Sequence, residues 1–192
     1  SSVGEVYEGE FKNSIREGQG ELKLTNGDRY VGSFVGGQIM GSGEYFWANG
    51  SVYKGQFVDG HREGQGYYRS TINEQYIGTF KKDRKNGFGE FRWASGNCYK
   101  GSFVNDIREG YGEVYWADGS YYKGEWKNGI QNGIGEQYVP GKQCLRGIFE
   151  NNNFIKEDLL SWKEACKKYP QINNAVVKPP VKHRKTNSKK LP

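Results

Sequence analysis

A five-residue motif, Tyr-x-Gly-x-Phe or Tyr-x-Gly-x-Trp, returns every 23 residues along this chain of 192 residues. Its six complete copies begin at Tyr7, Tyr30, Tyr53, Tyr76, Tyr99 and Tyr122, and leucine replaces the tyrosine in a seventh copy at Leu145. A Gly-x-Gly pair follows each complete copy at constant spacing. A fixed period of this length is typical of a stack of identical supersecondary units, and such stacks usually present binding surfaces.

Each unit reads as a β-hairpin. In the unit that starts at Tyr99, residues 99–103 and residues 110–116 are expected to form strands, with residues 105–109 as the loop between them. Both connections of a unit are short, which predicts an antiparallel meander that grows by one hairpin per repeat. The connection to the next unit carries dipeptides that are favoured in tight turns, at Asn26-Gly27, Asn49-Gly50 and Asp118-Gly119.

The glycines are expected to make room for aromatic rings. Pairing across the loop places Phe103 opposite Gly110 and Gly101 opposite Gly112, so a ring can lie flat over backbone that carries no side chain. Only 34% of the residues are apolar whereas 15% are aromatic, so stacked rings must supply most of the buried surface. These features predict an all-β repeat fold, an elongated and twisted single-layer sheet over residues 5–151.

Positive charge is concentrated at the C-terminal end. Residues 170–192 contain no acid and six basic side chains, Lys178, Lys182, Arg184, Lys185, Lys189 and Lys190. The net charge of the chain is +6, so residues 1–169 are balanced and offer no basic stripe for nucleic acid. The basic tail is compatible with an anionic-lipid contact, a nuclear import signal, a contact with an acidic partner, or a solvated segment without a dedicated role.

The sequence does not suggest catalysis. Its two histidines, His61 and His183, lie far apart, and three cysteines without a CxxC pair argue against a disulfide framework or a zinc site. We therefore expect a protein that is not an enzyme and that has no cofactor and no metal. Reduced cysteines and the lack of a secretory or membrane-spanning segment indicate the cytoplasm.

One face of the sheet is aromatic and is the predicted binding surface for a partner protein. Its rings suit a peptide or an amphipathic helix, and the candidates are Tyr76, Phe80, Phe91, Trp93, Tyr99, Phe103, Trp116, Tyr122 and Trp126. The alternative for each ring is packing against its neighbours. The opposite face, here called the polar face, carries a second candidate surface for a partner or for self-association, made of Phe88, Tyr111, Tyr115, Ile134 and Tyr138.

The segment that follows the repeats has a helical pattern. Ile155, Leu159, Trp162, Cys166 and Tyr169 fall on one helix face, so residues 153–169 are predicted to form a helix with its N-cap among residues 151–153. We expect this helix to cap the open end of the sheet, and the alternative is a mobile lid over the groove.

The repeat that begins at Tyr53 is irregular. Tyr67 stands where other repeats have glutamate, and Ser70 stands where they have tryptophan. We interpret these departures as simple drift, and the alternatives are a bend in the sheet or a contact site.

The repeats resemble those of the MORN family. Near-consensus copies are Tyr53-Lys-Gly-Gln-Phe57 and Tyr122-Lys-Gly-Glu-Trp-Lys-Asn-Gly129, and the chain is similar to short retinophilin-like members in having a helix after Phe149-Glu-Asn-Asn152. The resemblance implies a groove on one side of the sheet and a role as scaffold or adaptor in cytoskeletal, ciliary, motor or membrane-associated assemblies. The alternative is a membrane-surface module that binds anionic phospholipids through the tail and the sheet. Two sheets joined end to end would give a homodimer.

Overall fold

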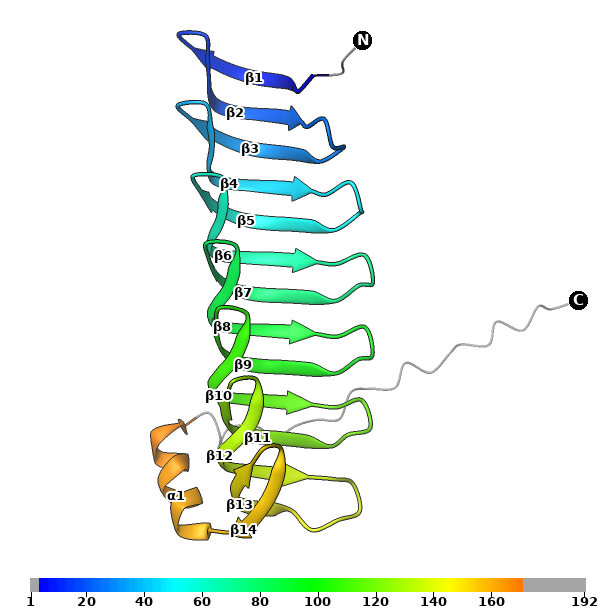
Figure 1. Cartoon of the computed structure of the whole chain (residues 1–192), viewed down its shortest axis with the longest axis vertical. Helices are drawn as coiled ribbons and strands as arrows, with labels where there is room; N and C mark the ends of the chain where they lie inside the picture. The colour runs from blue at the N-terminus through cyan, green and yellow to red at the C-terminus, as the bar shows by residue number, and fades with distance from the viewer. Residues whose placement is uncertain (1–3, 171–192) are drawn as a thin grey trace, which may run out of the picture.

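The computed structural model describes residues 4–170. Their backbone forms one antiparallel sheet in which the strands follow one another in sequence order, so the predicted meander is confirmed (Figure 1). The strands are β1 (Val6–Lys12), β2 (Ile15–Lys23), β3 (Arg29–Val35), β4 (Gln38–Phe46), β5 (Val52–Val58), β6 (His61–Arg69), β7 (Gln75–Lys81), β8 (Arg84–Arg92), β9 (Cys98–Val104), β10 (Ile107–Tyr115), β11 (Tyr121–Lys127), β12 (Ile130–Tyr138), β13 (Leu145–Glu150) and β14 (Asn153–Glu157). The helix of the described range is α1 (Leu159–Lys168).

Two kinds of connection alternate along the sheet. Each hairpin closes through a two-residue turn in which both residues have positive φ, as at Asn105 (48°) and Asp106 (71°). This conformation matches the twist of paired strands and favours Asn, Asp and Gly. Longer segments such as residues 24–28, which include Asn26-Gly27, join successive hairpins along the other side of the sheet (Figure 1). The predicted loop at residues 105–109 was therefore wrong, because β10 starts directly after the Asn105-Asp106 turn.

The predicted glycine pairing is confirmed only in part. Gly101 pairs with Gly112, but Phe103 pairs with Arg108 and not with Gly110, because a β-bulge separates these two pairs. Gly110 instead pairs with a residue of the next hairpin, Trp126 of β11. The bulge gives the second strand extra residues, and a bulged strand bends.

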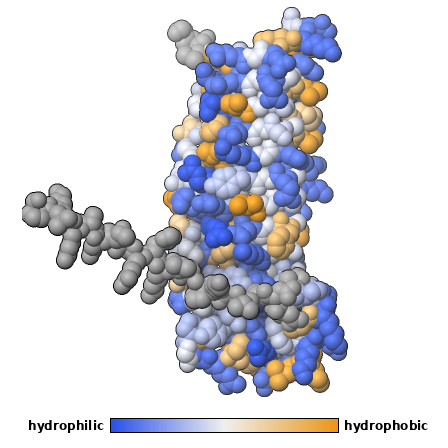
Figure 2. Space-filling model, turned by 180° about the vertical axis from the view of Figure 1, so that it is seen from behind, coloured by the Kyte–Doolittle hydropathy of each residue, from blue (hydrophilic) through white to orange (hydrophobic). Residues whose placement is uncertain are grey.

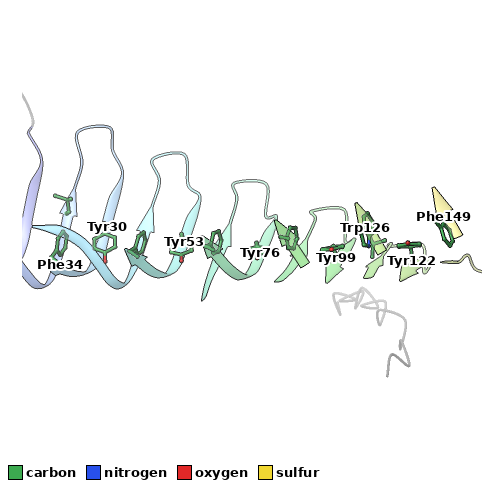
Figure 3. Close-up of a cluster of buried hydrophobic side chains, with 13 residues drawn as sticks. Tyr30, Phe34, Tyr53, Tyr76, Tyr99, Tyr122, Trp126 and Phe149 are labelled. Carbon is green, nitrogen blue, oxygen red and sulfur yellow. The ribbon is translucent and has the colours of Figure 1, made fainter. Parts of the chain in front are cut away.

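Aromatic rings form one continuous row along the sheet (Figure 3). Each repeat tyrosine meets the motif Phe or Trp of its own unit and of the next unit edge to face; for example, the Tyr76 ring centroid lies 5.0 Å from that of Phe80 and 5.4 Å from that of Phe103. The contacts continue without a break from Phe11 to Phe154. Such pairs contribute about 0.5–1.5 kcal/mol each beyond the area they bury. The row therefore supplies the core that a single-layer sheet otherwise lacks.

The seventh unit is a complete hairpin, and this corrects the predicted helix. Asn151 and Asn152 form a two-residue turn like those of the other units, so the chain returns as β14 and Ile155 lies on a strand. The helix begins only after Asp158, whose carboxylate accepts a hydrogen bond from the backbone N–H of Ser161 at 2.9 Å. Its main contacts are with β12 and β13. The helix thus covers part of a face, whereas the prediction placed it over the open end.

The irregular repeat keeps the geometry of its neighbours. The backbone N–H of Ser70 donates to the carbonyl oxygen of Glu74 at 2.9 Å, as the tryptophans do in other repeats, and Asn73 takes the positive φ of the turn glycine. β6 and β7 then pair in regular register. These observations favour drift over a bend in the sheet.

Candidate binding groove

The structure divides the nine predicted contact residues into two groups. Six of them are 4% exposed or less and belong to the ring row, namely Tyr76, Phe80, Tyr99, Phe103, Tyr122 and Trp126. Rings buried this deeply hold the hairpins together and are not available to a ligand, so we remove these six from the predicted binding surface. The other three, Phe91, Trp93 and Trp116, are half-buried and pack against the row from one side.

The repeat tyrosines from Tyr30 to Tyr122 are buried in the ring row. The Tyr99 ring lies over a pair of glycines, and a Cβ built on Gly101 would come within 2.5 Å of the tyrosine hydroxyl oxygen. That hydroxyl donates to the carbonyl oxygen of Ser102 at 3.0 Å, and the equivalent bond forms in all six complete motifs. Burial raises the pKa of Tyr30 and of Tyr53 to about 12, so these hydroxyls stay protonated at neutral pH.

Half-buried rings near the ends of the second strands form one wall, here called the aromatic wall. The ring centroids of Phe91 and Trp93 are 4.9 Å apart, and those of Tyr45 and Trp47 are 4.8 Å apart. Trp47 also meets Tyr68 of the following unit at 5.8 Å. The prediction selected Phe91 and Trp93 and missed the other three. The 23-residue period would have found them, because they occupy the same repeat positions.

A column of cations forms a second wall, here called the cation wall, and its residues were not among the predicted site residues. Arg62, Lys85 and Arg108 each pair with the motif phenylalanine of their own hairpin. Their charged groups lie over aromatic rings, with the Arg62 guanidinium 5.2 Å from the Phe80 ring and the Arg108 guanidinium 4.2 Å from the Trp126 ring. The available signal was a basic residue five positions after the motif phenylalanine in three consecutive repeats.

The two walls meet around a cavity of about 390 Å³. The rings of Phe91 and Trp93 line it together with Lys85, Asp106, Arg108 and Gly129. A hollow that combines ring surface with cationic groups can hold an apolar side chain and an anionic group side by side.

The second candidate surface is covered in part by the chain's own helix. Tyr111 and Ile134 pack against Trp162 and Cys166 of α1, and the Tyr111 ring stacks on Tyr169 at 4.8 Å. Burial, followed by the nearby Glu113 carboxylate, raises the pKa of Tyr111 far above its ordinary value.

The remaining members of that surface lie beside the helix. The Tyr115 hydroxyl donates to Glu113, and Tyr138 stacks on Tyr121 at 5.4 Å. Phe88 is 63% exposed. Figure 2 shows the side of the sheet that lies behind in Figure 1, where hydrophilic residues are interspersed with small hydrophobic groups. The structure thus assigns Tyr111 and Ile134 an intramolecular role, and Phe88 is the most exposed of the five.

The six basic tail residues lie outside the described residues, so the proposed lipid contact, import signal and acidic-partner contact stay predictions. Within residues 4–170, no group of three or more His, Cys, Asp and Glu side chains is arranged to hold a metal ion. The helix found in the same range is too short and too polar to cross a membrane.

The fold and the groove define a class, the open-ended β-hairpin repeat proteins. Residues 7–29, 30–52, 53–73, 76–98, 99–121 and 122–141 each match the MORN repeat model. The chain therefore belongs to the MORN-repeat family, and the β13–β14 hairpin lies beyond the matched residues.

Two solved structures are similar at a low level. One is the SAS-4 TCP domain of Drosophila melanogaster in complex with a proline-rich motif of Ana2. The match covers 67% of this chain and 71% of that chain, at 13% sequence identity and a TM-score of 0.43. The other is the TCP10c domain of Drosophila melanogaster Sas-4. The match covers 67% of this chain and 91% of that chain, at 16% sequence identity and a TM-score of 0.35. Similarity at this level gives no information about what this chain binds.

Proposed function

We propose that this chain is a non-catalytic scaffold whose groove binds a peptide or an amphipathic helix of a partner protein. The observation that carries the proposal is the cavity between the aromatic wall and the cation wall. Phe91, Trp93 and Trp116 lie outside the ring row and keep part of their ring surface open. Half-exposed tryptophans of this kind are the residue type most often responsible for binding energy at protein interfaces.

The repeat spacing supports an elongated ligand. Neighbouring strands lie about 4.8 Å apart, so equivalent positions of successive hairpins are separated by roughly 10 Å. Seven residues of an α-helix rise about 10.5 Å, and three residues of an extended peptide cover a similar length. A helix with apolar residues at i and i+7 would therefore meet the same wall position in consecutive units.

We also propose a place for this activity in the cytoplasm, in cytoskeletal, motor or membrane-associated assemblies. The support is the resemblance to scaffold members of the family together with the elongated sheet, which offers several binding positions in a line.

The test compares three proteins that must first show equal melting temperatures: the intact chain, Trp93→Ala/Trp116→Ala, and the control Phe88→Ala on the polar face. A partner captured by the intact chain is purified, and its Kd for each protein is measured. We expect the double variant to weaken binding by at least about tenfold, since truncating an interface tryptophan typically costs more than about 1 kcal/mol, and the control to bind normally. Equal binding by all three proteins would make the tryptophans structural and refute the groove as the binding site.

A further inference from the structure

The cation wall is neutralised at two of its three positions by a turn residue of the next hairpin. Each wall cation lies against the second residue of the next hairpin's turn, 21 positions later in sequence. For Arg62 and Lys85 that residue is an aspartate, Asp83 and Asp106. The groove therefore contains internal cation–carboxylate pairs in two consecutive units.

The Arg62 site shows how the wall holds a carboxylate. One carboxylate oxygen of Asp83 accepts from the backbone N–H of Arg62 at 2.9 Å and from its Nε at 3.1 Å. The backbone carbonyl of Asp83 accepts from Nη2 at 2.7 Å. Lys85 repeats the arrangement, because its backbone N–H and its Nζ both reach the same Asp106 oxygen, at 2.9 and 3.1 Å.

At Arg108 the carboxylate is missing because the turn residue is Gly129. The rest of the arrangement is preserved, since Nη2 of Arg108 donates to the Gly129 carbonyl oxygen at 2.6 Å and the Gly129 N–H donates to the Arg108 carbonyl at 2.9 Å. The N–H and the C=O of one strand residue point to the same side, so the Arg108 N–H faces this turn. Within residues 4–170, Arg108 is the wall cation that has no carboxylate within 4.0 Å.

The place of the missing side chain is open. A Cβ built on Gly129 would meet only Ile107, at an ordinary 3.7 Å, and Arg108 and Gly129 both line the 390 Å³ cavity together with Trp93. The nearest carboxylates are already engaged, because Asp106 is held by Lys85 and Glu109 accepts from the backbone N–H of Asn128. Burial also lowers the pKa of Arg108, as is typical of a cation that lacks a counter-charge.

We propose that the Arg108 position is a subsite for an acidic side chain of the bound peptide. This inference rests on the proposed function and names the chemistry that the groove selects. One carboxylate oxygen of the ligand takes the position that Asp83 occupies at Arg62 and accepts from the Nε and the backbone N–H of Arg108. An apolar side chain next to that acid packs against Phe91 and Trp93. The ligand thereby completes the wall position that the described part of the chain leaves without a carboxylate.

The test uses variants that fill or empty the subsite. Gly129→Asp supplies the internal carboxylate, and the backbone tolerates it because Asp83 and Asp106 already adopt φ of 67° and 71° at the equivalent position. Gly129→Asn fills the same place without the charge, because Asn152 takes that turn position at φ 66° and its side-chain oxygen accepts from the backbone N–H of Gln131 at 2.8 Å. Arg108→Gln removes the cation and copies Gln131, which stands at that position in the next unit.

The probes are peptides selected on the intact chain from a random library of displayed peptides about four turns of helix long. We expect the selected peptides to share an Asp or Glu next to an apolar residue. We also expect their affinity to fall at least about tenfold for Gly129→Asp, for Arg108→Gln and for an amide in place of the peptide acid, and to fall less for Gly129→Asn than for Gly129→Asp, because the amide occupies the position without neutralising the guanidinium.

The outcomes separate this inference from the proposed function. Peptides that lose affinity for Trp93→Ala/Trp116→Ala but carry no shared acid, or bind Gly129→Asp normally, would leave the groove function intact and overturn the acidic subsite. Tighter binding of a phosphoserine peptide than of its glutamate counterpart would overturn the choice of a carboxylate. Selected peptides that ignore the tryptophan variant altogether would overturn both.

Discussion

On the aromatic face the tyrosine, the glycine and the Phe or Trp of the motif recur in every complete unit, whereas on the polar face the columns change character along the sheet. The position between the two glycines of the Gly-x-Gly pair shows the change, because it is Gln19, Ser42 and Gln65 in early units and Phe88, Tyr111 and Ile134 in later ones. The repeat tyrosine, by contrast, is kept in all six complete motifs. The column that never varies builds the sheet, and the later part of the variable column is where α1 docks.

The same lesson applies within the groove. The turn column carries aspartate at Asp83 and Asp106 and then changes to Gly129, and the change coincides with the cavity. On the polar face, the change to Tyr111 and Ile134 coincides with the site where α1 packs. On the polar face the change accompanies a contact that is particular to this chain, and in the groove we propose the same for Gly129.

The largest expected loss of stability comes from a substitution that disrupts ring packing on the aromatic face. Gly101→Val places a side chain against the Tyr99 hydroxyl and the Cα of Gly112, each 2.5 Å from the new Cβ. Because backbone lies on one side and a buried ring on the other, we expect a loss of about 3 kcal/mol in the free energy of unfolding, measured by urea denaturation. The control Ser102→Val lies on the polar side of the same strand and should cost less than about 1 kcal/mol. Equal losses for the two variants would refute the flat-ring packing.

A smaller and local effect is expected on the polar face. Trp162→Ala removes the buried contact of α1 with Tyr111, so the helix should undock at a cost of about 2 kcal/mol while the sheet stays folded. Hydrogen exchange of residues 159–168 should accelerate more than tenfold, and exchange in β3 to β9 should not change. Leu160→Ala, at a residue that is 76% exposed, is the matched control. Acceleration throughout the sheet would show that α1 supports the whole fold.

The smallest effect concerns the internal carboxylate of the cation wall. Burial by itself raises the pKa of Asp83, but hydrogen bonds from the Arg62 backbone and from the His61 and Arg62 side chains outweigh it, so the pKa of Asp83 is lowered. A lowered pKa contributes stability that is present above the unfolded value of about 4 and is lost as the pH falls through the folded value.

Asp83→Asn should therefore reduce stability by less than about 1 kcal/mol at pH 7, because the pair is partly exposed. The difference from the intact chain should vanish in strong acid, as measured by urea denaturation between pH 7 and pH 2. A difference that stays constant over this range would assign the effect to packing instead of charge.

Much of the architecture was predictable because it is local. The alternation of residue types over five positions predicted which side chains share a face of each strand. The pairing of Gly101 with Gly112 was predicted by counting residues across the short loop, and it is confirmed. The bulge was not predictable from alternation, so the predicted pair of Phe103 and Gly110 was wrong. The predicted helix start was wrong because the seventh unit was taken to end at residue 151, whereas the turn at Asn151 and Asn152 follows the Asn128-Gly129 turn by one period and continues into β14.

The candidate site was predicted less well than the fold. The sequence pattern does not distinguish a ring such as Tyr99, which is buried in the ring row, from a ring such as Trp93, which lies on the aromatic wall. Both are aromatic residues on the aromatic face. Their burial differs because the first lies between two hairpins and the second lies at the margin of the sheet. The cation wall was missed because each of its pairs joins residues 21 positions apart, in different hairpins.

The sequence by itself determined the hairpin unit, its 23-residue period and the aromatic side of each strand, since these depend on neighbours within one repeat. The tertiary structure alone decided which rings are buried, that α1 lies on the polar face, and that Arg108 faces Gly129 where two other cations face aspartates. The physical reason is that burial and charge compensation depend on side chains from adjacent hairpins, and stacking the hairpins is what brings those side chains together.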